Sequence, residues 1–538
     1  MNIIHSFKEG KMSNKFIMTI LIGWILIFLI NNKVLGQQIT LPCVKDSMIG
    51  LIPAIPSSTP NYFCTWQTQK YFTNAADPSV MRENITESNM FGNEKYQGWI
   101  NFYTKVRSDL IFVMDDSWDI PIKGDSKNYF GSLILNSERF PNYAKTGVSN
   151  QEAMKQLNAA VKNKGWKALG GWVCAQEAPI YMNAKTQKEY WTERAQWANY
   201  SGFAYWKVDW GKHIYDYNFR KLLTDIAHQN APNLIVEHAQ NDSVIPVSDV
   251  FRTYDVPAIL SIPMTMKKLK KTLATYTTGN TYKGLICAED EAYIAAGLGC
   301  TMGIMRHPMA GNLPNGKPDP SFPAMHRNLK TKIDEVTRAV RWHRMAPAFG
   351  VNAMQTYVDT VNLTDWWEIQ NMAAEIESWW FEPWTGFHKN GNVISETAPA
   401  RISRGLPLPL VIPDESDDVP FVVASKNPNG AISITVSART RNRTYWTPIC
   451  DISLISGNAT TFGIFGYYKS LTISTDIELA NTTIKAQDLA GVKVIDITNR
   501  VTITGNKLII PGKVINEIGM GEQSAGDTSE PGLVLVIY

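Results

Sequence analysis

The sequence has few cysteines for its length, and no cysteine pattern typical of a metal site. Only six cysteines occur among 538 residues, and no two of them form a Cys-x-x-Cys pair. This spacing argues against a structural zinc site, and it allows one or two disulfides if the chain is exported. The pairs to test first are Cys43 with Cys64 and Cys287 with Cys300. Low-complexity segments and internal repeats are also absent beyond an alternation of strand and helix patterns, which excludes repeat architectures.

The chain lacks an excess of charge once its first 36 residues are set aside. This segment has a basic start, an apolar run over residues 16–30 and Val34-Leu35-Gly36 before Gln37, as in an export signal. The run is shorter than the ~20 residues of a spanning helix, so we expect cleavage and no stable membrane insertion. The segment also accounts for the whole formal net charge of +3, so the charge indicates no nucleic-acid partner. We therefore expect a secreted or periplasmic protein.

Length and texture predict two folded parts after the signal. Hydrophobic residues make up 44% of the chain and charged residues 19%, as in folded globular proteins. From about residue 60 to 310, strand-like runs alternate with helical stretches, which is typical of a parallel β/α architecture. From about residue 411 the pattern changes to β-branched alternation with turn dipeptides, as in a β-sandwich.

Strand ends can be placed within the first part. They fall at Thr65-Trp66, Met114-Asp115-Asp116, Trp172-Val173-Cys174, Val208-Asp209, Val236-Glu237-His238, Thr253-Tyr254-Asp255, Cys287-Ala288-Glu289 and Gly303-Ile304-Met305-Arg306. Eight such strands are what a (β/α)8 TIM barrel requires. Helices are predicted at 149–163, 190–200 and 217–228 and, after the last strand, at 329–346. The predicted organisation is a signal at 1–36, a catalytic barrel with an N-terminal extension at 37–400, and a C-terminal antiparallel β-sandwich at 401–538.

The segment Tyr205-Trp206-Lys207-Val208-Asp209-Trp210-Gly211 is the most informative in the chain. Side chains alternate along a strand, so Lys207 and Asp209 lie on one face among aromatic neighbours. Charged side chains are almost never buried unless they are paired. One hypothesis is a structural ion pair inside the barrel. The other is a catalytic carboxylate at the barrel mouth, where TIM-barrel active sites lie.

Polar clusters follow four of the predicted strands and favour the second hypothesis. They are Asp115-Asp116-Ser117-Trp118, Lys207 with Asp209, Glu237-His238, and Arg252 with Asp255. Strand ends at one barrel face converge on one pocket. Lys207 would keep Asp209 ionised, as a nucleophile needs, and burial could raise the pKa of Asp255, as a general acid needs. Glu289, Asp290 and Glu291 precede the next helix, and we expect at least two of them to cap it, although Glu289 could face the pocket mouth.

These motifs resemble the α-galactosidase group, glycoside hydrolase families 27 and 36 of clan D. In that group Asp-Asp-Gly/Cys-Trp follows the second strand, Lys-x-Asp ends the fourth, and an Arg precedes an Asp at the sixth. The resemblance covers about residues 60 to 310. It implies that Asp209 is the nucleophile and Asp255 the acid/base. The implied substrate-binding residues are Asp115, Asp116, Trp118, Trp172, Lys207, Glu237 and Arg252.

The chain departs from the group at two places near the proposed nucleophile. Family 27 usually has Asn-Cys after the nucleophile, where this chain has Trp210-Gly211. After the fifth strand, a run rich in Cys, Ser and Gly in family 36 is replaced by residues 237–242. Substituents on the sugar would be recognised at these places, so the resemblance predicts the reaction class better than the sugar.

The sequence therefore predicts a retaining exo-glycosidase that acts on an oligosaccharide or polysaccharide with terminal α-galactose or a related sugar. This chemistry requires no cofactor and no metal. Two alternatives remain open at this stage. A transglycosylase would pass the sugar to a sugar acceptor, which aromatic walls around an acceptor subsite would favour, and a non-catalytic carbohydrate-binding protein would keep the barrel without the reaction.

Overall fold

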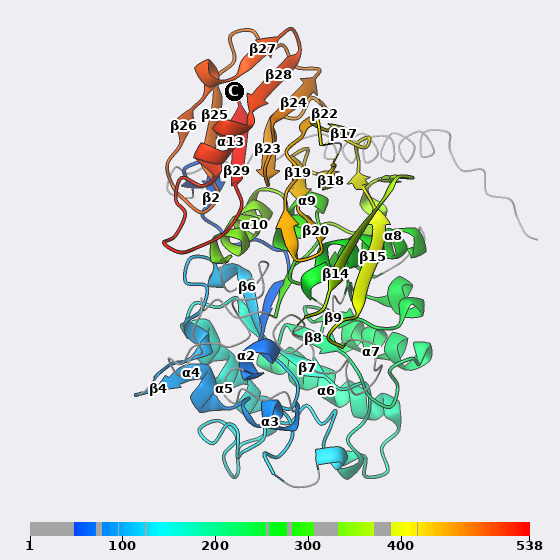
Figure 1. Ribbon diagram of the computed structural model, residues 1–538. Helices are drawn as coiled ribbons and strands as arrows, with labels where there is room; N and C mark the ends of the chain where they lie inside the picture. Colours follow the sequence, from blue (N-terminus) through cyan, green and yellow to red (C-terminus); the bar gives the residue numbers. More distant parts are fainter. Residues whose placement is uncertain are drawn as a thin grey trace, which may run out of the picture. The chain divides into compact units, whose positions relative to one another are not determined.

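The computed structural model describes residues 48–70, 78–94, 96–123, 126–253, 258–276, 282–305, 332–370, 389–416 and 418–538 (Figure 1). The predicted export signal, Cys43 and Asp255 lie outside the described residues. Within the described part of the chain, no helix is both long enough and apolar enough to cross a membrane. Residues 49–538 belong to one folded unit.

The first sheet is a parallel barrel. Its strands are β3 (Asn61–Cys64), β6 (Leu110–Met114), β7 (Ala168–Val173), β8 (Tyr205–Val208), β9 (Ile235–His238), β10 (Val250–Arg252), β11 (Leu285–Cys287) and β12 (Gly303–Ile304). Each strand pairs in parallel with its neighbour in the order β12, β3, β6, β7, β8, β9, β10, β11. A parallel bridge between Cys287 and Thr301 joins the two ends of this order. The eight predicted strands and the TIM barrel are confirmed.

Alternate side chains of these strands fill the barrel. One buried cluster combines Tyr62 and Cys64 of β3, Ile111 and Val113 of β6, and Tyr205 of β8 with residues of β10 and β11. Strand β7 places Gly170 beside Tyr205, where an added Cβ would lie 2.7 Å from the Tyr205 Cβ. Because side chains alternate, the inward position of Tyr205 also turns Lys207 and Asp209 toward the barrel interior.

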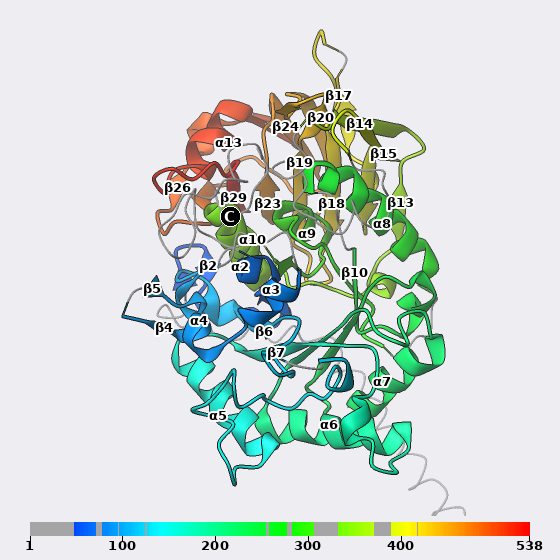
Figure 2. The same cartoon turned by 60° about the horizontal axis from the view of Figure 1, so that its bottom comes forward.

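Helices cover the outside of the barrel (Figure 2). They are α5 (Asn150–Asn163), α6 (Gln187–Ser201), α7 (Tyr217–Asn230), α8 (Ser261–Thr275) and α9 (Ala292–Leu298), and α10 (Ile333–Met345) follows the last barrel strand. Short helices α2 (Trp66–Lys70), α3 (Pro78–Glu83) and α4 (Glu87–Phe91) lie between β3 and β6. The helices predicted in these regions are confirmed, with ends displaced by a few residues.

Polar caps explain where these helices begin and end. The Ser149 hydroxyl accepts a hydrogen bond from the backbone N–H of the third residue of α5. Thr186 and Glu189 form a reciprocal capping box at the start of α6, which ends at Gly202 with φ 69°. The carboxylate of Asp216 caps α7. Side chains of Ser, Thr and Asp therefore satisfy the first backbone N–H groups of α5, α6 and α7.

The region after α10 is built from three further sheets. Their strands are β13 (Thr356–Val358), β14 (Asn362–Glu368), β15 (Val393–Pro399), β16 (Arg401–Arg404), β17 (Leu410–Ile412), β18 (Phe421–Lys426), β19 (Ile432–Ser437), β20 (Arg439–Arg441), β21 (Thr444–Trp446), β22 (Asp451–Gly457), β23 (Thr461–Phe465), β24 (Ser470–Thr475), β25 (Ile484–Asp488), β26 (Ile495–Asp496), β27 (Thr502–Thr504), β28 (Lys507–Pro511) and β29 (Gly532–Ile537). Most neighbouring strands are antiparallel, but β14 with β20, β16 with β18, β19 with β23, and β22 with β24 are parallel.

Two of these sheets pack face to face as a sandwich. One apolar cluster contains Ile434 and Leu533 of the eight-stranded sheet together with Ile452 and Leu471 of the five-stranded sheet. The β-rich region begins before residue 401, because β13 pairs with β16. The remaining sheet has the order β15, β14, β20, β21.

Helices α9 and α10 join the barrel to the sandwich. The Thr435 hydroxyl of β19 donates to the Tyr293 carbonyl of α9 at 2.7 Å, and the Ser433 hydroxyl donates to the Gly297 carbonyl at 3.1 Å. On α10, Arg338 pairs with Asp488 of β25 at 2.8 Å. Polar contacts as well as apolar packing therefore hold the two parts of residues 49–538 together.

All the cysteines within the described part of the chain are free thiols. Cys64, Cys287 and Cys300 are buried free thiols, as are Cys174 and Cys450. The pairing of Cys287 with Cys300 is therefore wrong, and Cys64 has no disulfide partner. Burial raises the pKa of the Cys300 thiol to about 11, so this side chain behaves as a small apolar group.

Candidate active site

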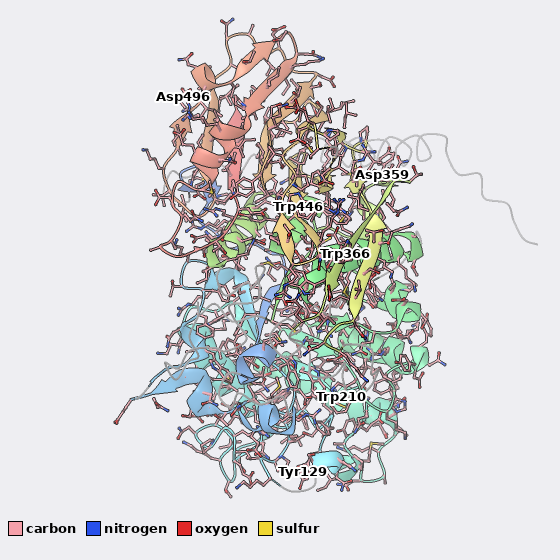
Figure 3. All side chains as sticks on the ribbon, in the orientation of Figure 1. Tyr129, Trp210, Asp359, Trp366, Trp446 and Asp496 are labelled. Atoms are coloured by element: carbon pink, nitrogen blue, oxygen red, sulfur yellow. The ribbon has the colours of Figure 1, made fainter. Side chains whose placement is uncertain are left out.

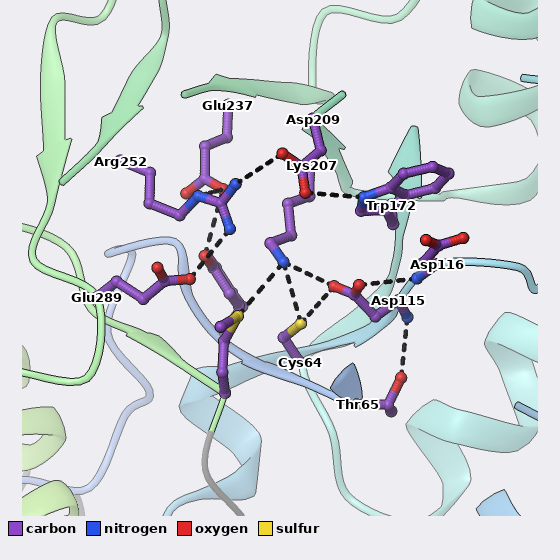
Figure 4. A network of polar contacts seen from close by, with 12 residues as sticks. Cys64, Thr65, Asp115, Asp116, Trp172, Lys207, Asp209, Glu237, Arg252 and Glu289 are labelled. Atoms are coloured by element: carbon purple, nitrogen blue, oxygen red, sulfur yellow. Dashed lines mark hydrogen bonds and ion pairs between the residues drawn. The ribbon is translucent and has the colours of Figure 1, made fainter. Parts of the chain in front are cut away.

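Charged side chains from successive strand ends meet at the mouth of the barrel (Figure 4). Lys207, Glu237 and Arg252 lie on β8, β9 and β10. Asp115, Asp209 and Glu289 follow the ends of β6, β8 and β11. All six residues are buried, and none is more than 7% exposed. Burying this many charges in one place is costly unless each has partners, so their contacts define the site.

Lys207 is paired with Asp115, not with Asp209. Its Nζ lies 2.6 Å from Asp115 Oδ2 and 3.3 Å from the Cys64 sulfur. The Asp115 backbone N–H donates to the Thr65 hydroxyl at 2.9 Å, which fixes the strand end. Burial alone would lower the pKa of Lys207, but the charges of Asp115, Cys64 and Glu289 together outweigh it and raise this pKa above its usual value. Lys207 therefore remains a cation inside the barrel.

Asp209 accepts contacts on both carboxylate oxygens. The Trp172 indole N–H donates to Oδ2 at 3.1 Å, and the Gln240 amide donates to Oδ1 at 2.6 Å. Arg252 Nη2 lies 3.5 Å from Oδ1. Burial alone would raise the pKa of Asp209, but the Arg252 and Lys207 charges and these two hydrogen bonds lower it below its usual value.

The backbone that carries Asp209 is held from outside the barrel by Arg220 of α7. Its guanidinium donates to the Asp209 carbonyl at 2.5 Å and to the Val208 carbonyl at 3.4 Å. His238 contacts the same guanidinium at 3.3 Å, and its other ring nitrogen lies 2.9 Å from the Thr224 hydroxyl. Burial lowers the pKa of His238 well below its usual value, so this imidazole is neutral. Arg220 therefore positions the nucleophile candidate without facing the barrel mouth.

Arg252 lies among three carboxylates. In addition to Asp209, its Nη1 is 3.1 Å from Glu289 Oε1, and its Nε is 3.5 Å from Glu237 Oε1. Among the described residues, Glu289 Oε2 has no hydrogen-bond partner. The carboxylates around Arg252 outnumber its single charge, and this surplus distinguishes the site from a simple ion pair.

Protonation of Glu237 reduces the surplus of negative charge around Arg252. The Tyr62 hydroxyl donates to its Oε1 at 3.2 Å, and the Tyr205 hydroxyl donates to its Oε2 at 2.9 Å. Burial raises the pKa of Glu237 to about 7, although the Arg252 and Lys207 charges lower it. Glu237 is therefore protonated in part of the molecules near neutral pH.

Asp116 lies beside the cluster and has its own cation. Arg82 Nε is 3.1 Å from Asp116 Oδ2, and the Ser117 hydroxyl donates to Oδ1 at 2.7 Å. Burial raises the pKa of Asp116 despite Arg82. The backbone of Ser117 has φ 84°, and Gln240 has φ 71°, so two of the strand ends carry the strained conformations common at functional sites.

The structure brings together most of the predicted site residues. Lys207 pairs with Asp115, and Arg252 contacts both Asp209 and Glu237. Trp172 contacts Asp209, and Asp116 is adjacent to Asp115 in the chain.

Trp118 lies elsewhere. It is fully buried in the core between barrel and helices, packs on Phe203 at 6.0 Å between ring centroids, and donates its indole N–H to the Trp172 carbonyl at 2.9 Å. It supports Trp172 from behind the sheet, so the structure does not place it as a wall of a sugar pocket.

The expectation that Glu289, Asp290 and Glu291 cap a helix is wrong for these side chains. The residue before α9 is Glu291, and it makes no side-chain cap to the helix; its carboxylate accepts from the Ser261 hydroxyl. Asp290 accepts from the Met305 backbone N–H at 2.8 Å. Glu289 contacts Arg252 and belongs to the site.

Sequence reasoning missed several members of the site. Tyr205 could have been found, because it lies two residues before Lys207 on the inward face of β8, and Tyr62 lies on the inward face of β3 by the same alternation. Gln240 and Arg82 carry no comparable signal, since their positions depend on loop conformation. Within the described part of the chain, no cluster of three His, Cys, Asp or Glu side chains is placed to hold a metal ion.

Neither a family model nor a curated protein matches the sequence. Among solved structures, the chain is similar to a Bacillus halodurans protein assigned provisionally as an alpha-N-acetylgalactosaminidase, with 9% identity, coverage of 89% of this chain and 96% of that one, and a TM-score of 0.39. For a Bacteroides fragilis protein assigned provisionally as an alpha-galactosidase/melibiase, the identity is 9%, the similarity covers 89% of this chain and 79% of that one, and the TM-score is 0.36. For an Anoxybacillus alpha-amylase, the identity is 9%, the similarity covers 89% of this chain and 97% of that one, and the TM-score is 0.38.

Proposed function

We propose that this protein is a retaining exo-glycosidase that removes terminal α-galactosyl or related α-glycosyl units by double displacement. The observation that carries the proposal is Asp209, a carboxylate at the end of β8 whose pKa is lowered mainly by Arg252 and Lys207 against the effect of burial. A nucleophile must be ionised and fixed in orientation. The bonds from Trp172 and Gln240 supply the orientation.

The proposed reaction has two steps. Asp209 attacks the anomeric carbon of the sugar as the glycosidic bond breaks, and Asp255 gives a proton to the leaving oxygen. In the second step Asp255 takes a proton from water, the water oxygen attacks the anomeric carbon, and Asp209 is released as a carboxylate. Two inversions leave the anomeric configuration unchanged. Asp255 is assigned by its position after Arg252 in the sequence and by the family resemblance.

The other site residues are proposed as ligands for sugar hydroxyls. Asp115, Asp116 and Glu237 are acceptors, and Lys207 and Arg252 are donors, at the ends of four strands. Trp172 offers an indole beside Asp209. Glu289 joins this set, because its Oε2 has no partner among the described residues. A ring with many hydroxyls suits such a dense set of buried polar groups.

The protein is also proposed to be exported from the cytoplasm. The basic and apolar pattern of residues 1–36 and the neutral remainder of the chain support secretion or a periplasmic location. The catalytic barrel is proposed to lie within residues 37–400, and the β-rich region that follows it begins with β13, before the predicted boundary at residue 401. The proposed chemistry uses only side chains, with no cofactor.

A second candidate function, sugar transfer, is favoured by the half-exposed Trp210 next to Asp209, since an aromatic surface there could hold a sugar acceptor. The remaining alternative is a carbohydrate-binding protein without catalysis. It would not require a nucleophile candidate that is kept ionised inside the barrel.

The test is hydrolysis of a panel of aryl α-glycosides by the wild type, Asp209→Asn and Asp255→Asn, with the anomeric form of the first product followed by NMR. We expect an α-product from the wild type and loss of turnover in both variants. A β-product would contradict the retaining mechanism. A wild type that binds sugars but turns over none of the panel would favour the binding protein.

A further inference from the structure

Two tryptophans that are adjacent in the chain point to opposite faces of the four-stranded sheet. Trp367 of β14 is 3% exposed and belongs to one apolar cluster with Ile259 and Leu260 of the barrel part. Side chains alternate along a strand, so Trp366 points to the other face of the sheet, where it is half-buried. The packing of this sheet on the barrel therefore uses Trp367 and leaves Trp366 on the outer face.

A second tryptophan lies on the same outer face. Strand register places Trp366 beside Arg441 of β20, and it places Arg441 opposite Thr444 of β21. Trp446 is two residues further along β21, so it points the same way as Thr444. In agreement with this placement, the Arg441 guanidinium lies 5.4 Å from the Trp446 ring. We call Trp366, Arg441 and Trp446 the tryptophan face, and Figure 3 labels both of its tryptophans.

The rings of the tryptophan face are not part of the core. Trp446 is half-buried like Trp366, and within the described part of the chain neither ring packs in an apolar cluster. Exposed hydroxyl side chains surround them: Ser395 pairs with Trp366 across the sheet, and the Thr364 and Thr397 hydroxyls are 2.8 Å apart beside this pair. The face thus offers aromatic rings with hydrogen-bonding groups at their edges.

The charges of the tryptophan face are balanced. Arg441 pairs with Asp418 at 2.9 Å, and Glu368 adds a negative charge on the same side of β14. Arg443 turns to the opposite face, where its guanidinium lies 5.3 Å from the Trp367 ring. A surface without excess positive charge has no attraction for an anionic polymer. Aromatic rings among hydroxyl groups suit a neutral glycan, whose sugar rings have an apolar C–H face and a polar edge.

The spacing and the place of the tryptophan face suit a polymer. Trp366 and Trp446 lie two strands apart, so ~10 Å separates them across the sheet. A single sugar can cover one ring, whereas a chain of sugars can cover both. The inner face of the sheet packs on η7 (Ala258–Leu260), in the connection between β10 and α8. Connections of this kind lie at the barrel end where the strands finish, which is the end that carries the candidate active site.

We propose that the tryptophan face binds a neutral polysaccharide chain at a place separate from the barrel site. A polymer held there keeps its other sugar units close to the barrel mouth, which raises their effective concentration at the candidate active site. The choice of a glycan as the ligand rests on the proposed function, but the binding requires no turnover. The two can therefore fail separately.

The test measures the binding of whole polysaccharides by affinity electrophoresis. Asp209→Asn is run in gels that contain galactomannan or soluble starch, which are neutral, or polygalacturonate, which is anionic. We expect at least one neutral polymer to retard the protein. Adding Trp366→Ala and Trp446→Ala should raise the dissociation constant about 10-fold, which corresponds to ~1.4 kcal/mol from two aromatic contacts. The same pair of positions changed to Phe should keep most of the affinity.

Two controls separate the tryptophan face from general effects. Tyr200→Ala removes another exposed aromatic side chain, 48% exposed on α6, and should leave the dissociation constant unchanged. With Asp209 intact, the two Ala substitutions should leave turnover of a small aryl α-glycoside unchanged. A melting curve checks folding, and if the double variant unfolds, the two single variants decide, each with an expected loss of about threefold.

Four results would overturn the inference. They are no retardation by either neutral polymer, an unchanged dissociation constant in the Ala variants, an equal loss in Tyr200→Ala, and tighter binding of polygalacturonate than of the neutral polymers. Hydrolysis of aryl α-glycosides without polymer binding would leave the proposed function in place. Loss of polymer binding in the Ala variants, with a wild type that hydrolyses nothing, would support the tryptophan face and not the hydrolase.

Discussion

Buried arginines have different surroundings in the two parts of the molecule. Between α10 and the sandwich, Arg338 donates one hydrogen bond to each carboxylate oxygen of Asp488, at 2.8 and 3.0 Å. Within the sandwich region, Arg439 meets Asp365 at 2.7 Å. At the barrel mouth, Arg252 is shared by three carboxylates at 3.1 to 3.5 Å.

The difference separates structural ion pairs from a binding site. A short bidentate pair satisfies both partners and needs nothing else. At the barrel mouth, four carboxylates (Asp115, Asp209, Glu237 and Glu289) face only two cations among the described residues, Lys207 and Arg252, which leaves a surplus of negative charge. The surplus must be met by a proton or by a ligand, and the raised pKa of Glu237 is the sign of a proton. The hypothesis of a structural ion pair between Lys207 and Asp209 is therefore not supported.

The largest contrast is expected for Asp209→Asn. It should lower kcat about a thousandfold or more, because an amide cannot form the covalent intermediate. Its thermal unfolding should change little, since the amide keeps one oxygen for Trp172. Initial rates on an aryl α-glycoside and a melting curve give the two numbers. Activity within tenfold of the wild type would refute the proposed role of Asp209.

Asp488→Asn should give the opposite result. It leaves Arg338 buried beside a neutral group, which costs about 3 kcal/mol of unfolding free energy. The rate per folded molecule should be unchanged, because Asp488 lies on β25 of the sandwich region. Urea unfolding and active-site titration measure the two effects. An equal loss of activity per folded molecule would show that the two kinds of arginine site are not separate.

Glu237→Gln should flatten the dependence of stability on pH. The folded pKa of about 7 lies above the ordinary value of 4.5, so the contribution of Glu237 is fully present below pH 4.5 and is lost as the pH rises through 7. This difference corresponds to at most about 3 kcal/mol. Tyr62, Tyr205, Arg252 and Glu289 face this carboxyl and remain in the variant. Urea unfolding from pH 4.5 to 8 should show a wild type that loses stability relative to the variant, and parallel curves would contradict the assignment.

The smallest effect is expected for Gln240→Ala. Its amide lowers the pKa of Asp209, so its removal should move the acidic limb of the kcat/KM profile to higher pH. The lost bond to a charged group should reduce kcat/KM about tenfold at the pH optimum. Gln240→Glu is the matched variant, because it replaces a hydrogen-bond donor with a negative charge beside Asp209. It should move the acidic limb to still higher pH. An acidic limb that stays in place in both variants would rule out Gln240 as a positioning residue.

The sequence predicted the barrel because its signals are local. The barrel strands are short, mostly apolar runs, several of them followed by a polar residue, and three of the outer helices begin at the side-chain caps Ser149, Thr186 and Asp216. The site residues on strands followed from the same alternation. The contacts that each site residue makes could not be predicted from the sequence, because strand register and loop conformation decide them. Lys207 pairs with Asp115 across the barrel, and Trp118 lies behind the sheet. The tryptophan face likewise depends on which strands meet in the four-stranded sheet.

The central claim is that Asp209 becomes covalently bonded to the sugar. The most direct measurement is incubation of the protein with a 2-deoxy-2-fluoro-α-glycosyl fluoride of the galactose series, followed by peptide mapping by mass spectrometry. The account predicts one added fluoroglycosyl group on the peptide that contains Trp206-Lys207-Val208-Asp209, with no label in Asp209→Asn. A label on Glu237, Glu289 or Asp255, with Asp209 unmodified, would contradict it.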